Sequence, residues 1–159
     1  MIKLLWLLFT FTLLYSKESV YLFPDQHSYC VHQLTQALKN TSERILVISP
    51  SFNHAELKKG ILEAAKHGKK VTLVLYDLHK DPLSMVQYEN IDLYRTSHPF
   101  HSSAFIIDNT LVCTFSGPIE KENFSSTRSS IRCSDEPKKI EWIRRSLQPL
   151  INSAKPYLE

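Results

Sequence analysis

Residues 44–76 constrain the fold of this chain more than any other segment. Two short apolar runs, 44–49 and 71–76, are rich in Val, Ile and Leu, a pattern typical of buried β-strands. Between them, residues 55–67 repeat apolar positions at helical spacing. A strand–helix–strand unit predicts two parallel strands joined by a right-handed crossover. The inward positions predicted for the helix are Leu57, Ile61, and Ala64 or Ala65.

The two ends of this predicted helix carry signals of their own. Asn53 precedes Glu56 by three residues, which is a capping-box spacing with Asn in place of Ser or Thr. Gly68 follows the last apolar position and can adopt the positive φ that ends many helices. The sequence therefore predicts where the helix begins and ends.

In the rest of the chain, turn and loop signals also separate the predicted helices and strands in a way typical of an α/β protein. Asp108-Asn109 is a turn-forming pair between two apolar runs, which predicts a β-hairpin. Residues 116–128 are polar and are predicted to form a loop. No internal repeat or low-complexity linker interrupts the chain, so one α/β domain is expected. The further predicted elements are helices over 25–40 and from 135 onward, and strands over 91–95, 104–107, 110–115 and 129–133.

The first sixteen residues are predicted to lie outside this domain. Residues 4–15 are apolar except for two threonines and follow a lysine, which suits the core of a signal peptide better than a full membrane span. Ser16 is a suitable small residue before a cut, whereas Leu14 fits the cleavage pattern poorly. We therefore expect residues 1–16 to be a signal peptide or, as the alternative, an uncleaved membrane tether. Either places the domain, 17–159, outside the cytoplasm of a bacterium, in the periplasm or tethered to the inner membrane.

Composition limits the function classes only weakly. With 43% hydrophobic and 22% charged residues, the chain is expected to be globular rather than disordered. Its net charge of +3 permits nucleic acid or anionic lipid as a partner but argues for neither. An oxidising compartment allows one cysteine pair to be bridged and one cysteine to be left over, and Cys113 and Cys133 lie in strands that could be neighbours. Three buried thiols, with Cys30 as the third, are the alternative.

His101 and Asp108 bracket one of the predicted strands, and the frame that they form is distinctive. A histidine followed seven residues later by an aspartate resembles the phospholipase D superfamily motif, His-x-Lys-x4-Asp. Ser51-Phe52 and the segment 63–77 also resemble small, single-motif bacterial endonucleases of that superfamily. The resemblance extends over residues 21–151 and implies a mixed β-sheet flanked by helices on both faces, an α-β-α sandwich.

The resemblance also implies a chemistry. In that family a neutral histidine attacks phosphorus, and the histidine of a second copy protonates the leaving oxygen. Lysines and asparagines hold the phosphate oxygens, and no metal or cofactor is needed. This implies a homodimer with the motif at the two-fold axis. It assigns His101 as the nucleophile, Ser116 as the motif serine, and Asp108 as a largely structural aspartate.

Three positions depart from the family pattern, and in the family all three either hold the phosphate or orient the histidine. Ser103 replaces the lysine, and Pro118 replaces the phosphate-binding asparagine. The glutamate that orients the histidine would fall near Ser129, within 125–130, a stretch without an acidic residue. Removing one donor to a transition-state oxyanion typically costs roughly 10²–10³ in rate. We therefore expect phosphodiesterase activity to be reduced or lost.

Several replacements and alternatives stay open. Ser103 and Arg128 are the predicted phosphate-binding residues, and Arg95 and Lys121 are further candidate cations. His98 and His101 are too weak a signal for a metal site. The alternative functions are a binding or dimerisation module that pairs with an active paralogue, and a phospholipid-processing enzyme; the expected ligands are accordingly nucleic acid or a phospholipid headgroup.

Overall fold

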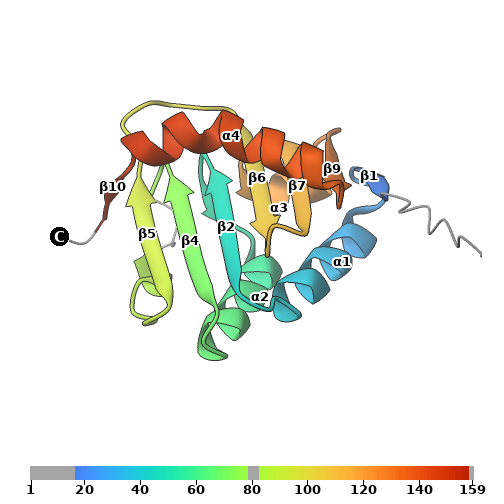
Figure 1. The fold of residues 1–159 in the computed structure, drawn as a ribbon. Helices are drawn as coiled ribbons and strands as arrows, with labels where there is room; N and C mark the ends of the chain where they lie inside the picture. Colours follow the sequence, from blue (N-terminus) through green and yellow to red (C-terminus); the bar gives the residue numbers. More distant parts are fainter. Residues whose placement is uncertain (1–16, 79–82, 158–159) are drawn as a thin grey trace, which may run out of the picture.

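A mixed eight-stranded sheet carries the fold, with strand order β1-β9-β7-β6-β2-β4-β5-β10 (Figure 1). The computed structural model describes residues 17–78 and 83–157. β2, β4 and β5 are parallel, and the remaining pairs are antiparallel. The strands are β1 (Glu18–Leu22), β2 (Arg44–Ser49), β4 (Lys70–Leu75), β5 (Ile91–Arg95), β6 (Ser102–Ile107), β7 (Leu111–Ser116), β9 (Ser130–Ser134) and β10 (Lys155–Pro156); β3 (Phe52–Asn53) and β8 (Ile119–Glu120) form a separate parallel pair.

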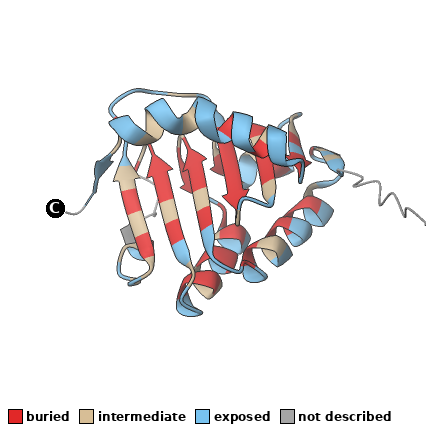
Figure 2. Ribbon diagram, viewed as in Figure 1, coloured by how far each residue is buried: buried red, intermediate tan, exposed pale blue. Residues whose placement is uncertain are grey.

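Helices cover both faces of the sheet, as the sequence predicts. Alternate strand residues point to opposite faces, and they belong to two separate apolar clusters. In the larger cluster, α1 and α2 bury Leu34 and Leu57 against strand residues such as Val47. In the smaller one, α4 buries Ile140 against Ile106. The helix surfaces that face away from the sheet are exposed (Figure 2). The helices are α1 (His27–Lys39), α2 (Ala55–Lys66), α3 (Lys121–Ser125) and α4 (Pro137–Ser153), with a short 3₁₀ turn, η1 (Leu83–Met85).

The predicted strand–helix–strand unit is confirmed as β2-α2-β4. Gly68 has φ of 77° and ends α2. The N–H of Lys69 donates to the Ala64 carbonyl at 3.1 Å, and that of Gly68 to Ala65 at 2.9 Å, which is a Schellman arrangement. The predicted capping box is wrong, because the N-cap is His54 and makes no side-chain cap bond. Asn53 instead belongs to β3, opposite Glu120.

Several parts of the fold were not predicted, among them β1 and the elements between β7 and β9. β1 is an edge strand whose side chains are exposed or half-buried, so its sequence lacks the buried alternation of a central strand. The predicted loop over 116–128 instead contains β8 and α3. Phe124 on α3 is fully buried between Phe23 and Phe115, with ring centroids at 4.8 and 5.0 Å. This aromatic packing orders a segment that looks irregular in sequence.

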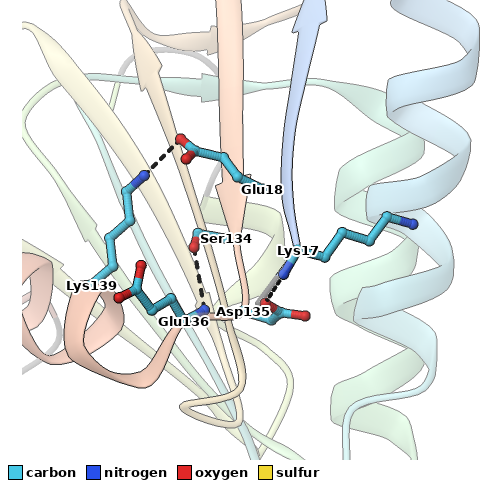
Figure 3. A network of polar contacts seen from close by, with 6 residues as sticks. All are labelled: Lys17, Glu18, Ser134, Asp135, Glu136 and Lys139. Carbon is cyan, nitrogen blue, oxygen red and sulfur yellow. Dashed lines mark hydrogen bonds and ion pairs between the residues drawn. The ribbon is translucent and has the colours of Figure 1, made fainter. Parts of the chain in front are cut away.

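Polar contacts join β1 to the start of α4 (Figure 3). Lys139 forms an ion pair with Glu18 at 2.7 Å, and the hydrogen bond and charge of Lys139 hold the pKa of the Glu18 carboxyl below its usual value. The backbone N–H of Lys17 donates to the Asp135 carboxylate at 2.6 Å. Both carboxylates are on the surface, so these bonds fix the position of β1 more than they stabilise the fold.

The cysteines follow the bridged alternative. Cys113 on β7 lies directly opposite Cys133 on β9, and the two form a disulfide. Cys30 is free and fully buried in α1, and burial raises the pKa of its thiol to about 12. In the described residues, no helix is long and apolar enough to cross a bilayer. The predicted signal peptide or tether, 1–16, lies outside the described residues.

The β6–β7 hairpin turns at Asp108 and Asn109, which have φ of 52° and 55°. The Asp108 carboxylate accepts hydrogen bonds from the backbone N–H groups of Ser42, Glu43 and Arg44 at 2.6 to 2.9 Å. Burial raises the pKa of Asp108, but these three N–H groups and the charge of Lys69 outweigh it and leave the pKa below its usual value. The hairpin is thereby fixed to the start of β2.

We predict that Asp108→Asn lowers the free energy of unfolding by about 1–3 kcal/mol at pH 7, since the amide cannot replace charge-assisted bonds. Asn keeps the positive φ available, so the turn itself is preserved. The lowered folded-state pKa means that the carboxylate stabilises the protein above its unfolded pKa, and that this contribution is lost as the pH falls through the folded pKa. Urea unfolding of both proteins over this pH range measures the difference. Asp25→Asn, at an exposed carboxylate, is the control, and a difference independent of pH would contradict the prediction.

Candidate functional site at the carboxyl edge of the parallel strands

His101 lies at the edge of the sheet where the parallel strands end. β6 runs antiparallel to β2 with Ala104 opposite Ile48, so the residue before β6 lies beside the end of β2. The side chain of His101 is exposed, and its carbonyl accepts the N–H of Gly117 at 2.8 Å. Asp108 is seven residues further along an extended strand, about 23 Å away at ~3.3 Å per residue. Asp108 therefore acts on the fold and not on a ligand bound at His101.

Ser116 reaches the same edge on the neighbouring strand. It lies at the end of β7, opposite Ser102, and both side chains are exposed. Together with Thr114, Ser130 and Arg132, they line a shallow hollow of about 250 Å³. Since side chains alternate along a strand, this hollow opens on the face of the sheet opposite to that of Ser103. Arg132 is a cation of this region that the sequence did not single out.

Ser103, at the motif's lysine position, is buried and hydrogen-bonded to other residues of the chain. Its hydroxyl donates to the Gly117 carbonyl at 2.5 Å and lies 2.8 Å from the Ser49 hydroxyl. The Ser49 hydroxyl in turn contacts the Ser51 carbonyl at 2.5 Å and accepts the N–H of Ile119 at 3.0 Å. Ser103 is 2% exposed and Ser49 is fully buried. These bonds join β2, β6 and the segment after β7 beneath the edge that carries His101.

The hydrogen-bond capacity of this pair of serines is fully used. Each hydroxyl has one proton, and three contacts compete for the two: the Gly117 carbonyl, the Ser51 carbonyl and the contact between the hydroxyls. No proton is left over for an external phosphate oxygen. The Ser103 hydroxyl therefore holds the fold in place and does not replace a phosphate-binding lysine.

Pro118 also leaves its site without a phosphate donor, since proline has no N–H and no polar side chain. Its carbonyl accepts the Asn123 amide at 3.0 Å and the N–H of Glu120 at 3.0 Å. The nearby amide of Asn123 is thus used to fix the loop. Ser129, at the expected glutamate position, donates to the Asn123 carbonyl at 3.1 Å.

A carboxylate does lie in this region, but at a position that the sequence did not indicate. Glu120 on β8 accepts a hydrogen bond from the buried Ser51 hydroxyl at 2.5 Å. The contact follows from the pairing of β3 with β8, two strands that are two residues long. Strands of that length have no periodicity to detect, so reasoning from sequence missed Glu120 and named Ser51 only as part of the family resemblance.

A second histidine lies buried beneath β3. His54 is 3% exposed, its ring centroid is 5.0 Å from that of Phe124, and neither ring nitrogen has a hydrogen-bond partner in the described part of the chain. Burial lowers the pKa of His54 and outweighs the opposing effect of Glu56. The neutral ring is an aromatic core residue.

The three candidate replacement cations occupy different places. Arg128 is exposed in the segment between α3 and β9, at the same edge as His101, because Ser130 begins β9 beside the end of β7. Lys121 opens α3. Arg95 ends β5, which is three strand positions from β6, about 14 Å at ~4.8 Å per strand. Arg128 is thus the predicted cation that lies nearest in the sheet order. Within residues 17–78 and 83–157, no three His, Cys, Asp or Glu side chains form a group that could hold a metal.

Solved structures share this arrangement over nearly their full length. NucT from Helicobacter pylori superposes with a TM-score of 0.80 and 18% identity, over 89% of this chain and 99% of its own. Nuc from Salmonella typhimurium, described as a phospholipase D family member, gives 0.75 and 20%, over 91% and 99%. The fold is the phospholipase D fold. The sequence matches no protein-family model and no curated protein.

The same fold also occurs in a DNA-binding context. TrmBL2, described as an archaeal chromatin protein with a novel mode of DNA binding, superposes with a TM-score of 0.65 and 12% identity, over 87% of this chain and 54% of its own. At these identities the likeness establishes the phospholipase D fold alone. Conclusions about activity depend on the residues at the edge that carries His101.

We predict that Ser103→Ala lowers the free energy of unfolding by about 1–2 kcal/mol, because buried partners lose their hydrogen bonds. The neighbouring variant Ser102→Ala removes an exposed hydroxyl and should change it by less than ~0.5 kcal/mol. Chemical unfolding of the two variants beside the parent protein measures both. Equal stability of the two variants would show that the Ser103 network does not hold the fold.

Proposed function

We propose that this chain is an exported phosphodiester-binding domain of the endonuclease type of phospholipase D fold, with little or no hydrolytic activity. The observation that carries the proposal is the commitment of the Ser103 hydroxyl to Ser49 and Gly117. A residue that is buried and saturated at the lysine position supplies no charge to a phosphate. The exposed His101 keeps a possible nucleophile at the edge but has no such cation beside it in the motif.

The expected decrease in the rate of phosphodiester hydrolysis follows from transition-state electrostatics. Each missing donor to developing negative charge costs roughly 10²–10³ in rate. With Ser103 and Pro118 at two donor positions, even strongly non-additive effects leave catalysis severely weakened. Binding tolerates these changes better, since one well-placed arginine can grip a phosphate through two hydrogen bonds. Arg128 is the residue that we propose for this role, and TrmBL2 is an example of the fold in a DNA-binding protein.

Two observations support export. Residues 4–15 have the length and composition of a signal-peptide core. The Cys113–Cys133 disulfide suits an oxidising compartment such as the periplasm. A signal peptide and a membrane tether both fit these observations.

We predict that purified residues 17–159 bind a single-stranded oligonucleotide but do not hydrolyse it, and do not hydrolyse phosphatidylcholine or a chromogenic phosphodiester. Arg128→Gln should weaken oligonucleotide binding severalfold, because it removes a charge-assisted contact. Lys138→Gln, at an exposed lysine on α4, is the charge-matched control. Turnover that His101→Ala abolishes would show that the site is still an active phosphodiesterase.

We also propose that the domain forms a homodimer with the edge that carries His101 at the two-fold axis, since one chain has a single motif. The exposed Ser102 and Ser116 leave this edge open in the single chain. Light scattering of residues 17–159 is expected to give twice the chain mass. Ser116→Arg, which places repelling charges across an axis, should then shift the protein toward monomer, whereas Ser146→Arg on the exposed side of α4 should not. A monomeric parent protein would contradict this proposal.

A further inference from the structure

A second pocket opens at the same edge of the sheet, beyond the end of β5. It has a volume of about 630 Å³ and lies between the ends of β4 and β5, β10 and the end of α4. Its lining includes two cations, Arg95 and Lys155, and two tyrosines, Tyr76 and Tyr157. We call it the Arg95 pocket. None of the candidate motif residues lines it.

Two cations face each other in this pocket, and neither has a counter-ion among residues 17–78 and 83–157. Arg95 and Lys155 are directly opposite across the β5–β10 pair. Neither makes an ion pair with any other described residue, and no carboxylate is among the described residues that line the pocket. Like charges at opposed positions destabilise a strand pair. The carbonyl end of α4 offsets part of the charge of Lys155, but Arg95 has no such partner. A bound anion would relieve the repulsion.

Two aromatic side chains flank the cations. Tyr76 follows β4 on one side of β5, and Tyr157 follows β10 and lies beside Leu93 on the other side. They are 37% and 38% exposed, so part of each side chain is open to solvent. Backbone hydrogen bonds hold both in place, from Tyr76 to Pro50 at 3.2 Å and from Tyr157 to Leu93 at 2.8 Å. The pocket thus combines rings for stacking with a paired positive charge.

We infer that the Arg95 pocket binds an unpaired nucleotide of a single-stranded nucleic acid, with the phosphate on Arg95 and Lys155 and the base against a tyrosine. Aromatic rings beside a cationic groove are the usual means of binding single strands. A choline headgroup would also suit tyrosines, but the two cations repel its ammonium. The inference rests on the proposed function. The Arg95 pocket adds a contact about 14 Å along the sheet edge from β6, at ~4.8 Å per β-strand. One single-stranded nucleic acid can therefore span the Arg95 pocket and the edge that carries His101.

The test compares a thymidine oligonucleotide with an abasic oligonucleotide of equal length, both titrated into residues 17–159 by fluorescence anisotropy. Arg95→Gln with Lys155→Gln should weaken thymidine binding about tenfold or more and flatten the log–log salt dependence by roughly 0.7, the value for one phosphate contact of a single strand. Arg44→Gln with Lys138→Gln removes the same charge at exposed positions outside the pocket and should change neither. Equal losses of thymidine affinity in the two double variants would show that the Arg95 pocket is not a binding site for the oligonucleotide.

The tyrosine is tested separately. Tyr157→Leu should weaken thymidine binding about tenfold, a typical stacking contribution, and leave abasic binding within about twofold. Tyr157→Phe keeps the ring and should retain the parent affinity. If the parent protein binds both oligonucleotides equally well, base stacking is overturned. If the Arg95 and Lys155 double variant binds thymidine normally while Arg128→Gln does not, the Arg95 pocket is not the binding site, and the proposed function stands. If the parent protein binds neither oligonucleotide, both the pocket and the proposed function are contradicted.

Discussion

The antiparallel contact between β2 and β6 holds the two halves of this sheet together. On one side of it lie the parallel strands β2, β4 and β5, and on the other the antiparallel strands that begin with β6. Asp108 fixes one end of this contact by binding three backbone N–H groups before and at the start of β2. The serine pair Ser49 and Ser103 fixes the other end. The junction is therefore secured by side chains at both ends and by the backbone ladder between them.

The two ends of this contact lie at different distances from His101. Asp108 is about 23 Å from His101 at ~3.3 Å per residue, so its structural role is independent of any chemistry at the histidine. Ser103 lies within the edge itself, where a lysine would have to keep its ammonium solvated or paired. A serine in that position instead closes a hydrogen-bond network across β2, β6 and Gly117. The Ser103 side chain thus contacts other parts of the same chain at this position.

The sequence predicted the parts of the fold whose signals are long or chemically specific. The strand–helix–strand unit, the stop at Gly68 and the turn at Asp108 rest on periodicity, on glycine at positive φ and on turn chemistry, and all three are present. β1 was missed because edge strands need no buried alternation, and the capping box at Asn53 failed because pairing with β8 took the residue into a strand. Tertiary contacts decided both cases.

The site was harder to predict because its decisive contacts join segments that are distant in sequence. Position alone showed that Ser103 stands where a lysine is expected, but its hydroxyl could still have served a ligand until its contacts with Ser49 and Gly117 were seen. Arg95 illustrates the opposite error: as an isolated cation it looks like a replacement for the lysine, but the sheet order places it three strands away from β6. Its pairing with Lys155, 60 residues further along the chain, exists only because β10 returns to the edge of β5. A charge that is unremarkable in sequence becomes informative when the fold sets a second one opposite it, because two neighbouring cations make a place where an anion can bind.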